Sequence, residues 1–279
     1  MRSGLWTTMT VVVALLAGPS FVAAQSDATA TPSVSLTLDE MQQFLLNAKV
    51  GKTKKMSKGV TKARQVEMSD GRMTHDAQIQ DVDIAIPFFQ VDPKHTEVNF
   101  KDSYRYNIAA YRLSRLLGLD NVPMSVERVV DGKPSAVTWW LDDVAIEEGD
   151  RVKKKVEGNP LRRRNYFGVM KVFDELIQNR DRNGGNILWS SDWKMWMIDH
   201  TRAFRLGKQL LDPKALNYCD RGLLDHLREL TRPALAEAVG KTLTNEEMDA
   251  LMVRRDLLVK LFDEKVATLG QGAVLFTLQ

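Results

Sequence analysis

Three oxygen-bearing side chains in one segment have the types and the order that phosphoryl transfer requires. Asp181 and Asn186 belong to the polar run Asp-Arg-Asn-Gly-Gly-Asn, and Asp199 follows the apolar stretch 195–198. One carboxylate can orient an attacking hydroxyl, while an Asn and an Asp can hold magnesium against nucleotide phosphates. The alternative is a solvated turn, because Asp, Asn and Gly favour turns for local reasons. Asp199 weighs against that alternative, since carboxylates are seldom placed behind an apolar strand without a partner.

The elements around these residues predict how they come together. A helix is expected to end near Asn179 and to lead into the polar run. The apolar stretches 187–189 and 195–198 predict a short hairpin with a turn at 190–192. Such a hairpin would bring Asp199 back beside the loop that holds Asp181 and Asn186.

This segment resembles the catalytic core of the phosphatidylinositol 3-/4-kinase-like branch of the protein-kinase superfamily, which also includes bacterial toxin kinases and secretory-pathway protein kinases. The hallmark of that branch is Asp-Arg-His-x-x-Asn followed by Ile-Asp-Phe-Gly. Here the two elements run from Asp181 to Asn186 and from Ile198 to Thr201, at the spacing of the lipid-kinase type. Asn183 replaces the usual His, and His200-Thr201 replaces Phe-Gly.

The resemblance implies a role for each residue of the core and names the cofactors. Asp181 would be the catalytic Asp, and Asn186 and Asp199 would be the metal ligands. The cofactors would be ATP and Mg²⁺. A loop that covers the phosphates would lie at 57–61 and include Lys58 and Gly59.

The resemblance also implies a Lys on the third strand that pairs with a Glu on the following helix. With that strand at 77–80, Gln80 stands where Lys is expected, and Asn107 stands where Glu is expected. Neutral hydrogen bonds are roughly half as strong as charge-assisted ones. Losing a preorganised charge beside a developing anion would cost about 3 kcal/mol, or on the order of a hundredfold in rate. Either another cation substitutes or activity is weak.

Four basic side chains are candidates for that substitute cation, and each can equally be a solvated surface charge: Lys54, Lys55, Lys58 and Arg72. In the same comparison Trp140 falls where the hinge between two lobes and an adenine pocket would lie. An aromatic ring there can stack on a base, or it can pack in the core.

The periodicity along the rest of the chain predicts an α+β protein with a strand-rich part followed by a helical part, and the resemblance implies that these are the two lobes of a protein-kinase-like fold. A small strand-rich N-lobe is expected over 37–142 and a larger helical C-lobe over 143–279. The expected strands are 63–68, 76–86, 122–130 and 136–141, with hairpin turns at Asp70-Gly71 and Asp131-Gly132. The expected helices are 38–49, 104–119, 165–178, 222–230 and a long one opened by the capping box of Thr244 and Glu247.

The N-terminus has the pattern of a secretory signal peptide over 1–24. Arg2 precedes an apolar run, and small residues end it before Gln25. A flexible spacer is expected over 25–36, so the protein is expected to be exported, periplasmic or secreted. The alternative is an uncleaved membrane anchor.

Composition excludes several classes of protein. Of 279 residues, 44% are hydrophobic and 27% charged, which argues against a disordered or collagen-like chain. The formal charge of +3 gives no general polyelectrolyte role. The basic runs 151–155 and 162–164 can engage an anionic substrate or a membrane surface, or be solvated; no nucleic-acid motif accompanies them. With Cys219 as the one cysteine, no disulfide can form within the chain.

The expected function is therefore ATP- and Mg²⁺-dependent phosphoryl transfer by an exported atypical kinase to a hydroxyl acceptor on a protein, a lipid or a sugar. The alternative is a pseudokinase, weak or inactive in catalysis, that acts as a nucleotide-binding or regulatory module. The neutral residues Gln80 and Asn107 and the export signal favour the alternative, whereas the intact set of Asp181, Asn186 and Asp199 favours catalysis.

Overall fold

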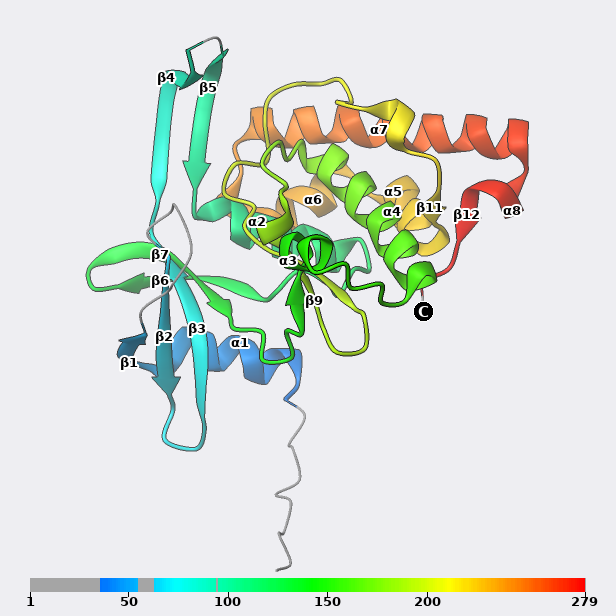
Figure 1. Ribbon diagram of the computed structural model, residues 1–279. Helices are drawn as coiled ribbons and strands as arrows, with labels where there is room; N and C mark the ends of the chain where they lie inside the picture. Colours follow the sequence, from blue (N-terminus) through cyan, green and yellow to red (C-terminus); the bar gives the residue numbers. More distant parts are fainter. Residues whose placement is uncertain (1–35, 55–62, 94, 279) are drawn as a thin grey trace, which may run out of the picture. The chain divides into compact units, whose positions relative to one another are not determined.

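A five-stranded antiparallel sheet forms the first half of the fold (Figure 1). The spatial order of its strands is β1 (Lys49–Lys54), β2 (Arg64–Ser69), β3 (Thr74–Gln80), β7 (Lys133–Trp139) and β6 (Ser125–Val130). The computed structural model describes residues 36–54, 63–93 and 95–278. The expected signal peptide, almost all of the expected spacer, and Lys55, Lys58 and Gly59 lie outside the described residues.

Alternation along β3 gives the sheet one apolar face and one polar face. Ala77 and Ile79 are buried in a core with Phe44 and Leu45 of helix α1 (Leu38–Asn47). Because successive side chains of a strand point to opposite faces, the two glutamines of β3 belong to the other face. That face carries helix α2 (Arg105–Leu116), which contacts β6 and β7 and, through Asn107, also Gln80 of β3.

A separate two-stranded hairpin lies between β3 and α2. It consists of β4 (Asp83–Asp92) and β5 (His95–Ser103), and Figure 1 shows it standing apart from the five-stranded sheet. The single strand predicted over 76–86 is therefore wrong: β3 ends at Gln80, and the chain enters another sheet. No Gly or Pro marks the change, but the consecutive polar residues Gln80 and Asp81 shift the apolar alternation by one position, a break that the prediction of a single strand overlooked.

Helices dominate the second half. Its elements are α3 (Glu148–Lys153), α4 (Pro160–Ile177), α5 (Arg221–Glu229), α6 (Arg232–Val239), α7 (Asn245–Leu269) and α8 (Gln271–Val274), with the short strands β8 (Ile146–Glu147), β9 (Ile187–Trp189), β10 (Met195–Met197), β11 (Cys219–Asp220) and β12 (Leu275–Phe276) and the 3-10 turns η1 (Gly184–Asn186), η2 (Pro213–Ala215) and η3 (Gly240–Thr242). One apolar core joins α2, α4, α5, α6 and α7. The predicted hairpin before Asp199 is confirmed as the antiparallel pair β9–β10.

Helix starts show how local signals act. The capping box predicted at Thr244 is present, and α7 begins at the next residue. In contrast, α4 begins earlier than its apolar stripe predicted, because Asn159 caps it through a hydrogen bond from the backbone N–H of Arg162 and Pro160 occupies the first turn. Among the described residues, no helix has the length and apolar content needed to span a membrane.

Candidate active site

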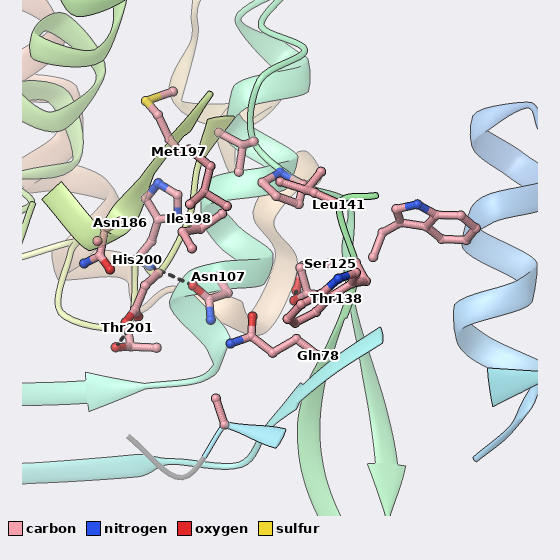
Figure 2. Close-up of a pocket in the computed structure, with 18 of the residues that line it drawn as sticks. Gln78, Asn107, Ser125, Thr138, Leu141, Asn186, Met197, Ile198, His200 and Thr201 are labelled. Atoms are coloured by element: carbon pink, nitrogen blue, oxygen red, sulfur yellow. Dashed lines mark hydrogen bonds between the residues drawn. The ribbon is translucent and has the colours of Figure 1, made fainter. Parts of the chain in front are cut away.

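A cleft of about 780 Å³ lies where the sheet meets the helical half. Figure 2 shows one wall made by polar side chains of the sheet and another made by apolar side chains around β9 and β10. The sheet wall includes Gln78, Ser125 and Thr138, and the opposite wall includes Leu188, Met197 and Ile198. The hydroxyls of Ser125 and Thr138 are 2.9 Å apart and hydrogen-bonded.

The three residues with phosphoryl-transfer chemistry all line this cleft. Asp181 and Asn186 come from the loop after α4, and Asp199 follows β10. The side-chain amide of Asn186 donates to the backbone carbonyl of Asp181 over 3.2 Å. The backbone N–H of Ile198 donates to the backbone carbonyl of Asn186 over 3.1 Å, which joins the loop to the strand before Asp199. The sequence reasoning placed these three together, and the structure does so too.

Asp199 is held in an unusual state. Its φ is 53°, in the left-handed region that few non-glycine residues adopt and that Asp tolerates better than most. Burial raises the pKa of its carboxyl, and the nearby carboxylates of Asp102 and Asp181 raise it further, while hydrogen bonds from Thr201 oppose the rise. The Thr201 hydroxyl donates to Asp199 Oδ1 over 3.0 Å. Carboxylates gathered in this way favour a bound cation.

A buried ion pair between Arg182 and Asp174 supports the loop that holds Asp181 and Asn186. The guanidinium of Arg182 makes two 3.0 Å hydrogen bonds to the carboxylate of Asp174 on α4. It also donates to the backbone carbonyls of Asn186 (2.9 Å) and Ile198 (2.7 Å). Bidentate guanidinium–carboxylate pairs fix geometry as well as adding energy. Arg182 therefore sets the distance between the loop and the strand that precedes Asp199.

His200 extends this network toward the sheet. Burial lowers the pKa of His200 well below its ordinary value, and the charge of Arg182 lowers it further, so the ring is neutral. Arg182 then donates to His200 Nε2 over 2.9 Å. The backbone N–H of His200 donates to Asn107 Oδ1 over 2.8 Å, as Figure 2 shows.

The pair expected to replace Lys and Glu is in contact. Because Asn107 Oδ1 accepts from the backbone of His200, its amide nitrogen must face Gln80, and it donates to Gln80 Oε1 over 2.7 Å. Gln80 is 3% exposed, and its own amide nitrogen has no hydrogen-bond partner among the described residues. Asn107 lines the cleft. Gln78 also lines it, whereas Gln80 is not among the lining residues.

Trp139, the last residue of β7, and Trp140 have different surroundings. Trp139 stacks on His75 with ring centroids 3.8 Å apart and meets Phe44 edge-on, which is core packing, although it also borders the cleft. Trp140 lines the cleft, and its backbone N–H donates to the carbonyl of Asp76. Trp140 therefore borders the cleft, and the stacking of its ring on a base stays a prediction.

Of the four candidate substitute cations, the two in the described residues are engaged elsewhere. Lys54 pairs with Asp76 at 2.6 Å, and Arg72 pairs with Asp70 in the β2–β3 turn at 3.1 Å. Neither lines the cleft. Lys55 and Lys58 are not described. Arg202 lines the cleft instead, a residue that the sequence reasoning missed because no motif spacing singles it out.

The donor set suits a hard divalent cation. Asp199 and Asn186 offer a carboxylate and an amide oxygen to the same cleft. Magnesium is commonly held by one or two protein side chains together with phosphate oxygens and water. No cluster of three His, Cys, Asp or Glu side chains suited to a metal occurs in the described part of the chain. The residues therefore fit a metal that arrives with a nucleotide better than one held by protein alone.

The basic runs are used for structure only in part, since Lys153, Lys154, Lys155 and Arg164 are exposed. Arg151 makes two hydrogen bonds to Glu148 and is 8% exposed. Arg163 donates to the backbone carbonyl of Glu157, and Arg164 lies over the ring of Tyr218. The runs are thus not uniform solvated faces.

Comparison with known proteins gives the fold. No protein-family model matches the sequence, and no curated protein matches it. The structure of hydra Fam20 with sugar aligns at a TM-score of 0.64 and 13% identity, over 86% of this chain and 92% of that one. The Golgi casein kinase with Mn/ADP bound aligns at 0.62 and 15%, over 85% and 78%. The Helicobacter pylori proinflammatory kinase CtkA aligns at 0.50 and 11%, over 81% and 98%.

At these identities the likeness concerns the fold. The α+β organisation, with a strand-rich sheet followed by a larger helical part, is the one expected from the sequence and is shared with these kinases. This chain therefore has a protein-kinase-like fold.

Proposed function

We propose that this protein is an atypical kinase that transfers a phosphoryl group from ATP, with Mg²⁺, to a hydroxyl-bearing acceptor. The observation that carries the proposal is that Asp181, Asn186 and Asp199 line one cleft in a kinase-like fold. A neighbour of the same fold holds Mn/ADP, which supports the use of a nucleotide and a divalent metal. The motif from Asp181 to Asn186 supports membership of the phosphatidylinositol 3-/4-kinase-like branch.

Each residue then has a distinct role. Asp181 accepts a hydrogen bond from the acceptor hydroxyl, orients its oxygen and takes its proton as the new O–P bond forms, while the bond between the terminal phosphorus and its bridging oxygen breaks and ADP leaves. Asn186 Oδ1 and the Asp199 carboxylate hold the metal, whose charge offsets that of the phosphates. Trp140 and the apolar wall receive the base. The assignment of Lys58 and Gly59 to a loop that covers the phosphates stays a prediction from the resemblance.

The neutral contact between Gln80 and Asn107 supports a second candidate, a pseudokinase that binds nucleotide without turnover. Two amides place no positive charge where a kinase of the usual type has Lys. The N-terminal pattern over 1–24 supports export in either case. The acceptor class, whether protein, lipid or sugar, is left open.

Two measurements test the proposal. Millimolar ATP with Mg²⁺ is expected to raise the melting temperature, because a ligand at about a hundred times its Kd adds about 2.7 kcal/mol of stability. Transfer of radiolabel from ATP is then compared between the wild type and Asp181→Ala, with Asp225→Ala on the surface of α5 as the matched control.

Asp181→Ala is expected to lower transfer by roughly 10²–10⁴-fold while nucleotide still shifts the melting curve. A shift without transfer in the wild type would establish the pseudokinase. No shift in the wild type, or equal transfer by Asp181→Ala, would remove the kinase proposal.

A further inference from the structure

Arg202 is the sole cationic side chain that borders the cleft in the part of the chain that the structure describes. Its side chain is 29% exposed. The other basic residue there, His200, is 2% exposed, and its Nε2 is already hydrogen-bonded to Arg182 over 2.9 Å. A nucleotide brings several negative charges into a cleft that already holds Asp181 and Asp199. Positive charge from the described walls must therefore come from Arg202.

The guanidinium of Arg202 is fixed at one end. Its Nε donates to Asp102 Oδ2 over 3.2 Å, and its carbon lies 5.4 Å from the centroid of the Phe100 ring. Asp102, at the end of β5, is 3% exposed, so this anchor is buried. A guanidinium held by a carboxylate and an aromatic face loses little freedom when its remaining N–H groups bind another anion.

The free end of Arg202 lies beside Asp181. Its Nη1 is 3.5 Å from Asp181 Oδ2, close enough for an ion pair but longer than an ordinary hydrogen bond. The residue two positions after Asp181 supplies no charge. The side-chain amide of Asn183 is used locally: its nitrogen donates to the backbone carbonyl of Asp181, and its oxygen accepts from the backbone N–H of Gly185.

We propose that Arg202 is the residue that binds the terminal phosphoryl group, the one being transferred. This inference rests on the proposed function, under which the acceptor hydroxyl sits at Asp181 and the terminal phosphoryl group therefore lies next to it. Arg202 is anchored at that end of the cleft, whereas Gln80 lies behind Asn107 on the sheet side. When the phosphoryl group enters, Arg202 exchanges Asp181 for phosphoryl oxygens and leaves the Asp181 carboxylate open to the hydroxyl.

The rival account gives Arg202 a structural role alone, as the partner of the buried Asp102. The two accounts differ in what a substitution does to two nucleotides. A contact to the terminal phosphoryl group affects a triphosphate and spares a diphosphate, whereas a distorted cleft weakens both.

The test measures the affinity of Mg²⁺-loaded ADP and of the β,γ-imido analogue of ATP by calorimetry. The proteins are the wild type, Arg202→Gln, Arg202→Lys and the surface control Arg228→Gln on α5. Arg202→Gln is expected to weaken the triphosphate analogue about ten- to a hundredfold, the range of one charged hydrogen bond. ADP affinity is expected to change less than about twofold. Arg202→Lys should retain part of the preference, and Arg228→Gln all of it.

An equal loss of both affinities in Arg202→Gln, or no loss of either, would overturn the inference. Should Arg202→Gln fail to fold because Asp102 is left buried and unpaired, the double variant Asp102→Asn/Arg202→Gln removes both charges and carries the same measurement. A wild type that binds neither nucleotide would instead remove the proposed function. Because binding is the readout, the test holds for an enzyme and a pseudokinase alike.

Discussion

The two sides of the cleft solve the same problem, holding polar groups in place, with different chemistry. On the sheet side the groups are neutral: Gln78, Ser125 and Thr138 line the cleft, and Gln80 lies on the same face of β3. On the loop side they are charged, and the Asp174–Arg182 pair lies beneath them. Neutral hydrogen bonds contribute about 1 kcal/mol each, but a broken buried ion pair costs about 3–5 kcal/mol. The loop side should therefore be held in place more strongly than the sheet side.

The largest effect is expected from breaking the ion pair on the loop side. Arg182→Met leaves Asp174 buried without its cation and removes two bonds to backbone carbonyls. The free energy of unfolding should fall by about 3–5 kcal/mol, measured by urea denaturation. The double variant Asp174→Leu/Arg182→Met should recover part of that loss. A loss of unfolding free energy below about 1 kcal/mol would show that the ion pair holds the loop side no more strongly than neutral hydrogen bonds hold the sheet side.

A smaller effect is expected on the sheet side. Asn107→Ala leaves Gln80 Oε1 and the backbone N–H of His200 without partners, which should cost about 2–3 kcal/mol of unfolding free energy. Asn107→Asp is the informative control, because its carboxylate can still accept from His200 and Gln80 can turn its unpartnered amide nitrogen toward it. Denaturation should therefore place Asn107→Asp near the wild type; equal losses in both variants would contradict this account of the pair.

The smallest effect is a pH dependence at the junction of the two sides. His200 stays neutral in the folded protein because burial and the charge of Arg182 lower its pKa. In the unfolded chain its pKa is about 6.5. Below that pH the unfolded state binds more protons, so stability falls as pH falls, by up to about 1.4 kcal/mol per unit for this group.

Urea titrations between pH 7 and 5 measure that slope. His200→Asn should flatten the pH dependence relative to the wild type, while His226→Asn, on the exposed side of α5, should leave it unchanged. An unchanged slope in His200→Asn would mean that other groups carry it.

The loop side could be predicted from the sequence because its key residues are close along the chain. Asp181, Asn186 and Asp199 are joined by a short hairpin, so local spacing nearly determines their meeting. The contact of Gln80 with Asn107 followed from strand register and helix position taken from a resemblance. The ion pair between Arg202 and Asp102 joins two segments that are far apart along the chain. Asp102 belongs to the β4–β5 hairpin, which the sequence analysis did not predict, and hydrophobic periodicity does not indicate contacts between distant segments.

Register explains the remaining differences. Period-two alternation indicates which face a side chain takes but not which sheet the strand enters, so 76–86 was predicted as one strand. The same alternation predicts that Gln78 shares the face of Gln80, and Gln78 does line the cleft, although the sequence reasoning did not select it. A pocket for a base, or an ion pair between segments far apart along the chain, can be located only once the fold is known.

The amide contact between Gln80 and Asn107 has a consequence for the conditions in which the cleft keeps its shape. A lysine–glutamate pair weakens in acid once the glutamate takes a proton, and in strong base once the lysine loses one. Two carboxamides have no proton to gain or lose across that range, so this bridge between sheet and helix holds equally in an acidified compartment and a neutral one.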